Sequence, residues 1–382
     1  MGPMPTNIVF GGSLCRILLL GSLLAGAGGL LAGAGAGAEV PADVQWQIEA
    51  ISVSPGSEAA ADLQWFRLAT HCHSGYSRDS DADLATLLQS AVDRGADAFV
   101  VNDHGTYAAC DDPVFLSQES LVTICGQEWS GIEGGAPDPP HAGIFNVPSS
   151  SPIMTGWPIE EMVAETHAAG GAVIAHHPFM RGLGWPEERL APGIDAVEVW
   201  NGTGFLARNP QALAWWQTHL QEGRRITGVG GTDLHVATGN PLAPCNHLLA
   251  RSVAPEDLRA AIVAGRVSVS DSEWGPRVAL WADADGSGEF AVPMGANVKL
   301  TEPTRVTIRA EVLGGAGMRI SLHTHRGLLW EGDVPSDAWA LRASARLTPS
   351  LRTFLRAEIR SGGREDLEGL SNPIYLNFPP RR

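Results

Sequence analysis

Histidines and acidic residues recur in short clusters between residues 71 and 235 of this 382-residue chain. Six imidazoles and three carboxylates are involved: His71, His73, Asp79, His104, Glu128, His141, His177, Asp233 and His235. Imidazole nitrogens and carboxylate oxygens are the ligands that borderline divalent metals accept. These side chains exceed what one four-coordinate ion can use. We therefore expect a multinuclear metal site if they converge.

The elements expected to carry these clusters are short apolar runs that alternate with helical patterns. The strand-like runs cover residues 65–70, 98–103, 121–128, 142–147, 172–178, 196–202 and 226–233, and the helical patterns cover 81–95, 159–171 and 209–223. This alternation predicts a parallel sheet with helices outside it, either open or closed into a barrel. Each cluster lies at the end of its run, and in α/β barrels these ends form the active site. The pattern therefore favours a barrel.

After residue 274 the pattern changes to alternating apolar and polar residues between Gly-, Asp- and Pro-rich turns. The runs at 277–285, 304–313, 318–325, 350–360 and 372–378 show this pattern. It predicts a small antiparallel β-sandwich. We therefore expect a lead segment at 39–64, a barrel domain at 65–272 and a β-sandwich domain at 273–382.

Residues 1–38 have the layout of a secretory signal peptide. Arg16 is their only charged residue, and an apolar Gly/Ala/Leu run follows it. The run closes on the small residues 36–38, just before Glu39. This layout predicts cleavage and export to the periplasm or the extracellular space, with no stable membrane insertion afterwards. The length of the run leaves an uncleaved membrane anchor as the alternative.

Cysteine content and charge restrict the environment and the partners. Cys72, Cys110, Cys125 and Cys245 would lie in an oxidising compartment, where disulfides persist. Cys110 and Cys125 flank one short segment and could pair, although four cysteines allow three connectivities. The net charge of −16 argues against long nucleic acids as partners, because neutralising phosphates needs a basic surface. Lys299 is the only lysine and is distant from the clusters in sequence, which argues against Schiff-base chemistry.

The ordered series His-x-His, Asp-His, Glu, His, His-Pro and Asp-x-His over residues 66–272 resembles the PHP family, named for its polymerase and histidinol phosphatase members. AVEVWNG and the C-terminal segment ending in SNPIYL look like the CehA/McbA branch, the carbaryl-hydrolase type. The resemblance implies a distorted seven-stranded β/α barrel with up to three ions, often zinc, manganese or iron. One departure concerns the form HxHxxxSDG, in which the acid follows the first histidine by seven residues. Arg78 stands at that position here, and Asp79 comes one later.

The resemblance also implies roles for individual residues. It places His71, His73, Glu128 and Asp233 on a first ion, with Glu128 bridging to a second ion completed by His141 and His177. It places Asp79, His104 and His235 on the third ion. Asp103, His176 and Arg181 lie near these motifs in sequence and are candidates for proton transfer or anion binding. For His176, the alternatives of facing the substrate and supporting the ligands stay open.

Hydrolysis is the chemistry that such a site predicts. A water shared between divalent ions loses a proton near neutral pH and supplies hydroxide without a protein nucleophile. We expect an exported phosphoesterase with two or three ions of Zn²⁺, Mn²⁺ or Fe²⁺, acting on small-molecule phosphomonoesters or phosphodiesters. Hydrolysis of carbamate or carboxylic esters is the alternative within enzymes. An exported binding protein with a catalytically idle barrel is the alternative from another class.

Overall fold

The structure is a computed structural model that describes residues 44–51, 62–131, 140–180, 185, 192–202, 209–361 and 366–381. The expected signal peptide at 1–38 and the candidate residue Arg181 lie outside the described residues. No helix within the described ranges is long and apolar enough to span a membrane.

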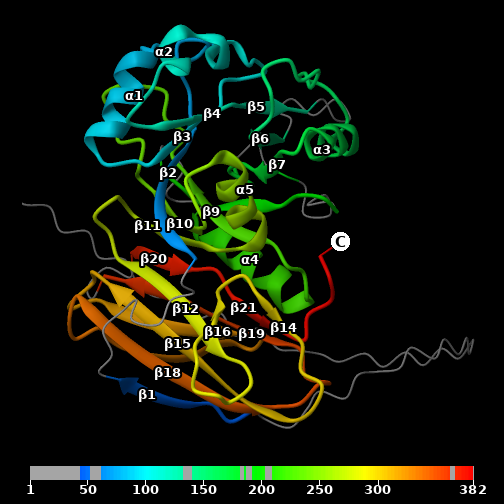
Figure 1. Cartoon of the computed structure of the whole chain (residues 1–382), viewed down its shortest axis with the longest axis vertical. Helices are drawn as coiled ribbons and strands as arrows, with labels where there is room; N and C mark the ends of the chain where they lie inside the picture. The colour runs from blue at the N-terminus through cyan, green and yellow to red at the C-terminus, as the bar shows by residue number, and fades with distance from the viewer. Residues whose placement is uncertain are drawn as a thin grey trace, which may run out of the picture. The chain divides into compact units, whose positions relative to one another are not determined.

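Strands and helices alternate up to residue 270, largely where the apolar pattern predicts them (Figure 1). The strands are β1 (Gln47–Ile51), β2 (Gln64–Cys72), β3 (Ala98–Val101), β4 (Val122–Ile124), β5 (Gly126–Ser130), β6 (His141–Phe145), β7 (Ala172–Ala175), β8 (Ala196–Asn201), β9 (Thr227–Gly231), β10 (Cys245–Ala250) and β11 (Val267–Ser270). The helices are α1 (Leu84–Asp93), a 3₁₀ turn (Ala108–Asp111), α2 (Pro113–Leu116), α3 (Ile159–Ala168), α4 (Asn209–Glu222) and α5 (Pro255–Ala264). In α1, Asp83 caps the first turn by accepting from the backbone N–H of Thr86, and the leucines at helical spacing are buried.

Apart from β1, these strands belong to two sheets that are linked at their edges. One sheet has the order β5-β6-β7-β8-β9, and the other contains β11-β10-β2-β3-β4. Two isolated parallel bridges join them, one between His104 and Glu128 and one between Cys72 and Leu234. Both bridges involve residues in or next to the predicted metal clusters. The sheet edges therefore meet where the candidate ligands lie.

The predicted parallel sheet is in fact mixed. The pairs β7–β8, β8–β9, β2–β3 and β3–β4 are parallel, but β6 is antiparallel to both β5 and β7. Only residues 131–140 connect β5 to β6, fewer than the dozen or so that a crossover to a parallel strand requires. The prediction that each cluster ends its strand is therefore wrong for His141, which begins β6. His141 still reaches the common edge because β6 runs in the opposite direction.

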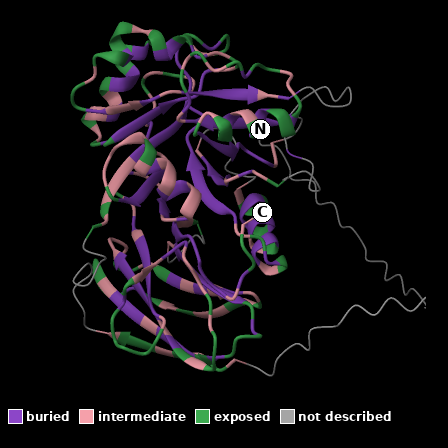
Figure 2. Ribbon diagram, turned by 45° about the vertical axis from the view of Figure 1, so that its right-hand side comes forward, coloured by how far each residue is buried: buried purple, intermediate pink, exposed green. Residues whose placement is uncertain are grey.

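The remaining chain is built from strands alone within its described part. They are β12 (Arg277–Asp283), β13 (Val292–Pro293), β14 (Asn297–Val298), β15 (Thr304–Leu313), β16 (Arg319–Thr324), β17 (Gly327–Asp333), β18 (Ala338–Leu347), β19 (Thr353–Arg360), β20 (Leu367–Ser371) and β21 (Ile374–Leu376). An antiparallel sheet has the order β1-β18-β15-β12-β13, so β1 of the lead segment joins it. Side chains from this sheet and from β16, β19 and β21 form one buried aliphatic cluster. In Figure 2 the buried residues of these strands are purple, among intermediate and exposed residues in pink and green.

Backbone pairing continues from one half of the chain into the other. β20 pairs antiparallel with β11, which makes a single eleven-stranded sheet. The buried Asn372 side chain accepts from the N–H of Gly228 in β9 and donates to the carbonyls of Gly228 and Val267. Tyr375 and Phe378 pack into the core cluster of the first half. The C-terminal strands therefore help to fix the beginning of β9, the strand that leads to Asp233.

Candidate metal centre

Glu128 is buried in β5 at the centre of the histidine clusters. Its carboxylate oxygens lie 2.8 to 3.5 Å from an imidazole nitrogen of each of six histidines. The contacts are to Nε2 of His71 (3.1 Å), Nε2 of His73 (3.5 Å), Nδ1 of His104 (3.1 Å), Nδ1 of His141 (3.2 Å), Nδ1 of His176 (2.8 Å) and Nε2 of His177 (3.2 Å). Imidazoles from the ends of four strands therefore converge on the one carboxylate that β5 supplies.

Asp233 completes an inner group with His71, His73 and Glu128. Its Oδ1 lies 3.3 Å from Nε2 of His71 and 3.6 Å from Nε2 of His73. Two ligands on a tetrahedral ion with bonds of about 2.0–2.1 Å are themselves about 3.3 Å apart. The four distances from the two imidazoles to Glu128 and Asp233, 3.1 to 3.6 Å, match this separation. The inner group therefore has the spacing of ligands around one ion.

Asp79, His104 and His235 form an outer group on the solvent side of the cluster. Oδ2 of Asp79 lies 3.2 Å from Nε2 of His104 and 3.5 Å from Nε2 of His235. The side chains of His104, His235 and Asp79 are 20%, 29% and 56% exposed, whereas those of the inner group are at most 7% exposed. His73 also lies within coordinating reach of His104 and His235. The cluster is therefore open to solvent, and to a substrate, on this side.

Several overlapping groups of three can each accommodate an ion. The described residues contain the groups His73, His104 and His235; His71, His73 and Glu128; His71, His177 and Asp233; His104, Glu128 and His141; and His71, His176 and Glu198. Within each group the ligand atoms lie within 4.8 Å of one another. The site can therefore hold more than one metal ion, with Glu128 shared between groups.

Buried polar atoms without hydrogen bonds support this assignment. Within the described chain, Nε2 of His71, Nε2 of His73, Oε2 of Glu128 and Nδ1 of His141 are buried and lack a hydrogen-bond partner. A buried polar group left unpaired costs about 1–3 kcal/mol, and such groups are rare in proteins. Metal coordination would satisfy these atoms, so the donor set fits a group of divalent ions.

The electrostatics of the inner group also favour a bound cation. Burial alone would lower the pKa of His71, but the charges of Glu198, Glu128 and Asp233 raise it well above its usual value. Burial alone would raise the pKa of Asp233, but the neighbouring His71 holds it well below its usual range. Burial lowers the pKa of His73 to about 4. The carboxylates are thus anionic, and neutral His73 keeps a lone pair available as a ligand.

The backbone is strained at three of the candidate ligands. His71, His177 and Asp233 have φ angles of 60°, 24° and 53°, in the left-handed region that residues other than glycine rarely adopt. Each such residue costs of order 1–3 kcal/mol, and such strain clusters at functional sites. In β2 the strained His71 coincides with a shift in the register against β3. The chain therefore accepts local strain where it turns these side chains toward the shared centre.

Glu198 in β8 belongs to this centre but is absent from the sequence-based ligand set. It is fully buried, and its Oε1 lies 2.6 Å from Nδ1 of His71. Its Oε2 accepts from the backbone N–H of His177 at 2.8 Å and from the Asn201 amide at 3.2 Å. Burial would raise the pKa of Glu198, but the charges of His71 and His176 lower it to about 2. An ionised Glu198 only accepts, so Nδ1 of His71 donates to it, and Nε2 is the ring nitrogen that faces Glu128 and Asp233.

A glycine pattern could have pointed to Glu198. A Cβ at Gly231 in β9 would clash with the Glu198 carboxylate. Likewise a Cβ at Gly143 in β6 would clash with the imidazole of His176. Glycine therefore leaves room for a polar side chain from the adjacent strand at both places. For Glu198, the trace of this arrangement in the sequence is the GVGG run of β9.

Asp103 is buried behind the ligands, next to the loop that carries His73. Its carboxylate accepts from the backbone N–H of Ser74 at 2.6 Å, from the Ser74 hydroxyl at 2.7 Å and from the Ser77 hydroxyl at 3.0 Å. Oγ of Ser77 lies 3.1 Å from Nδ1 of His73 and accepts from the backbone N–H of His104. Asp103 therefore fixes, through Ser77, the loop that presents His73.

His176 lies beneath His71 and is 1% exposed. The two rings stack with their centroids 3.6 Å apart, and Nδ1 of His176 is 2.8 Å from Oε1 of Glu128. Burial lowers the pKa of His176, so a neutral ring fits this place. In this position the ring touches the ligands Glu128 and His71 and is shielded from solvent.

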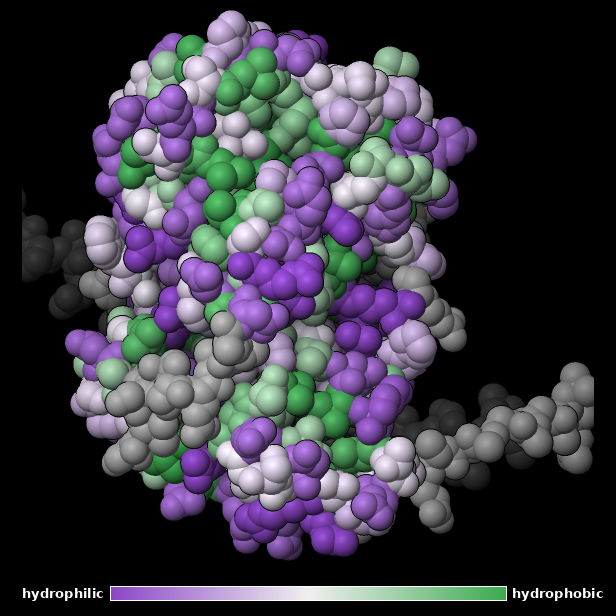
Figure 3. Space-filling view, viewed as in Figure 1, coloured by the Kyte–Doolittle hydropathy of each residue, from purple (hydrophilic) through white to green (hydrophobic). Residues whose placement is uncertain are grey.

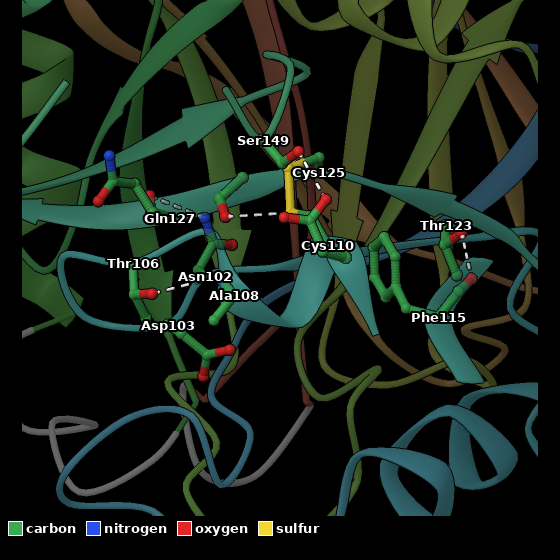
Figure 4. Close-up of a disulfide and its surroundings, with 12 residues drawn as sticks. Asn102, Asp103, Thr106, Ala108, Cys110, Phe115, Thr123, Cys125, Gln127 and Ser149 are labelled. Atoms are coloured by element: carbon green, nitrogen blue, oxygen red, sulfur yellow. Dashed lines mark hydrogen bonds between the residues drawn. A yellow bond between two sulfur atoms is a disulfide. The ribbon is translucent and has the colours of Figure 1, made fainter. Parts of the chain in front are cut away.

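Cys110 and Cys125, one of the pairings that the sequence left open, form a disulfide. The bond links the 3₁₀ turn after β3 to the segment between β4 and β5 (Figure 4). Cys72 and Cys245 are buried free thiols, and burial raises the pKa of Cys72 to about 12. Neither thiol belongs to the candidate ion groups that the described residues form. The disulfide holds together the two segments that carry His104 and Glu128.

Comparison with models of known protein families gives no match, and no curated protein matches the chain. The site must therefore be interpreted from its own chemistry. The site is a cluster of imidazoles and carboxylates in which several ligands are shared between groups. The cluster is buried except on the side of the outer group, which is open to solvent. It supports a metalloenzyme.

Asp79 provides the test of the outer group. Replacing Asp79 with alanine is expected to remove one ion per chain and leave the inner ions bound, because Asp79 contacts only His104 and His235 among the candidate ligands. Elemental analysis of the purified protein measures this change. The exposed Asp81 is the matched control, and Asp81→Ala should keep the full metal content. Loss of two ions from Asp79→Ala would contradict the separate outer group.

Proposed function

We propose that this chain is an exported metal-dependent hydrolase of the PHP type, related to the CehA/McbA branch. In this proposal the strands β2, β3 and β5–β9 close as a distorted seven-stranded barrel, and a β-sandwich domain follows from residue 273. The bridges between His104 and Glu128 and between Cys72 and Leu234 support closure, because they join the edges of the two sheets. The disulfide supports export, since such bonds persist in oxidising compartments.

The observation that carries the hydrolase proposal is the position of Glu128 within 3.5 Å of six imidazoles. We assign the first ion to His71, His73, Glu128 and Asp233, and the second to Glu128, His141 and His177. Asp79, His104 and His235 would hold the third. When bound, divalent ions of the Zn²⁺, Mn²⁺ or Fe²⁺ type acidify water and withdraw charge from an ester oxygen.

Phosphoesters are the proposed substrate class. A group of divalent cations stabilises a phosphoryl group, with its several charged oxygens, more than it stabilises a neutral carboxylic or carbamate ester. The exposed outer group around Asp79 gives a small-molecule substrate access from solvent. Hydrolysis of carbamate or carboxylic esters is the second candidate, because the segment AVEVWNG at 196–202 resembles the carbaryl-hydrolase branch.

The protein groups behind the ions have positioning roles in this proposal. Asp103 fixes the His73 loop through Ser77. His176 positions Glu128 through a hydrogen bond and His71 through ring stacking. Neither side chain needs to reach the substrate for these roles. Arg181, which follows the His177 segment in sequence, is retained as the candidate that binds the substrate anion.

Chelation followed by metal reconstitution tests the function. We expect treatment with EDTA to abolish hydrolysis of bis(p-nitrophenyl) phosphate or p-nitrophenyl phosphate, and added Zn²⁺ or Mn²⁺ to restore it. p-Nitrophenyl acetate and a p-nitrophenyl carbamate, assayed in parallel, distinguish the second candidate. A metal-loaded protein that cleaves none of these esters would instead favour a binding protein with an idle barrel.

A further inference from the structure

A second pocket lies at the end of β9 opposite the metal centre. Four arginines contribute to its lining together with small and apolar residues of α5 and of residues 293–296, and its volume is about 370 Å³. The arginines are Arg225, Arg259, Arg266 and Arg381. Arg225 precedes β9 and Asp233 follows it, so the strand, about 16 Å long at 3.3 Å per residue, separates the two places. We call this site the arginine pocket.

The arginines of the pocket lack carboxylate partners. Among the described residues, none of the four forms an ion pair with an aspartate or glutamate, although the chain has 42 acidic and only 26 basic residues. Arginines elsewhere in the chain do pair, as Arg94 does with Glu273 and Arg356 with Glu358. An acidic protein has therefore placed several of its few cations together without neutralising them.

Three acidic side chains act electrostatically on these arginines: Asp62 and Asp257 on Arg266, and Asp195 on Arg381, and the last two are engaged elsewhere. Asp195 influences Arg381, but its carboxylate is bound by the imidazole of His167 and the backbone N–H of Val173. Asp257 influences Arg266, but it pairs with Arg251. The positive charge of the pocket is therefore not neutralised by Asp195 or Asp257.

The protein holds the guanidinium groups in place and leaves donors free. Arg225 donates to the carbonyl of Gly295, Arg266 to the carbonyl of Leu249, and Arg381 to the hydroxyl of Thr227. The Nε atoms of Arg225 and Arg381 are buried without a hydrogen-bond partner in the described structure. Burial, and then the charge of Arg381, lowers the pKa of Arg225, which reflects the repulsion between the two cations. A bound anion would relieve that repulsion.

We propose that the arginine pocket binds a small phosphorylated anion, at a site separate from the metal centre. Guanidinium groups present forked N–H donors that match the oxygens of a phosphoryl group. The volume falls within the range of small-molecule sites, about 300–1,000 Å³. Hydrophilic side chains also gather in Figure 3 over the area where Figure 1 places α5, the helix that contributes Arg259. This inference does not depend on the proposed hydrolase activity.

Calorimetric titration with inorganic phosphate and pyrophosphate tests the proposal. The full chain is used after chelation, so that ions at the metal centre cannot bind the probe. We expect saturable binding of pyrophosphate with a Kd below about 1 mM. The double variant Arg225→Gln/Arg381→Gln should bind at least tenfold more weakly. The control Arg305→Gln/Arg346→Gln removes the same charge from exposed positions on β15 and β18, and it should bind as the wild type does.

The single variant Arg259→Gln keeps the test valid if the double variant does not fold. Arg259 is partly exposed on α5, so its replacement should not disturb folding. It should weaken pyrophosphate binding severalfold while circular dichroism and thermal unfolding stay unchanged. Failure of both probes to saturate would overturn the proposal. So would equal weakening in the pocket variants and the control, which would show only a nonspecific effect of net charge. Either result leaves the chelation test of the metal centre unaffected.

Discussion

Replacing Glu128 with alanine is expected to remove at least two ions from the protein and to abolish hydrolysis. Glu128 is the carboxylate that approaches six imidazoles, from 2.8 Å at His176 to 3.5 Å at His73. It takes part in two of the candidate ion groups, one with His71 and His73 and the other with His104 and His141. Its removal therefore takes away a shared ligand and the anion that offsets the charge of both ions. The loss of metal affinity and activity should exceed the 10- to 100-fold loss that is typical when a residue which only orients a ligand is replaced.

Elemental analysis of the wild type and of Glu128→Ala measures this prediction directly. Glu358→Ala is the matched control, because Glu358 is equally inaccessible and charge-paired but contacts Arg356 and Arg360 in the C-terminal strands. The control should keep its metal whatever its effect on thermal stability. An unchanged metal count in folded Glu128→Ala would remove the bridging role, and with it the shared-ligand arrangement.

The sequence predicts three of the helices from their apolar faces but misses α5, which also buries one apolar face. α1, α3 and α4 lie within the helical patterns at 81–95, 159–171 and 209–223. The direction of β6 was not predictable from such local signals, because an apolar run looks the same whichever way the strand runs in a sheet. The short link between β5 and β6 was the available sign of reversal. The run at 121–128 also divides into β4 and β5, which belong to different sheets.

Most of the candidate ligands are visible in the sequence because they stand at the ends of apolar runs. His73, His104 and Asp233 each follow a strand at the edge where their neighbours also end. Glu198 has no such signal, since it lies inside β8 among apolar residues. Its partner His71 is 127 residues away, so only the pairing of strands reveals that they meet. The arginine pocket escapes prediction for the same reason, because its four arginines are scattered between residues 225 and 381.

The second large effect concerns Glu198, which we expect to set the metal affinity without binding metal itself. Replacing Glu198 with glutamine keeps the shape of the side chain but removes its charge and half of its accepting capacity. The amide would turn a donor toward either Nδ1 of His71 or the backbone N–H of His177, both of which now meet carboxylate oxygens. His71 would then lose the partner that fixes its tautomer. We expect the metal affinity to fall 10- to 100-fold.

A purely structural role for Glu198 would lower the stability of the metal-free protein without changing metal affinity once folded. Two measurements distinguish these cases. The Glu198→Gln protein is freed of metal by chelation and titrated with Zn²⁺, and its thermal unfolding is followed separately without metal. Glu273→Gln is the control, because Glu273 is also buried and is bound by Arg94 and Asn240 instead of a candidate ligand. It should leave the Zn²⁺ titration unchanged.

Conservative replacement adds a further distinction. Glu198→Asp keeps the charge but shortens the reach toward His71, so its Zn²⁺ affinity should lie between that of the wild type and that of Glu198→Gln. The outer ion at Asp79 should respond least, because Glu198 contacts neither Asp79 nor His235 among its described partners. Wild-type Zn²⁺ affinity in both variants would show that His71 is oriented without Glu198. The inner ions would then depend on Glu128 and Asp233 alone for their negative charge.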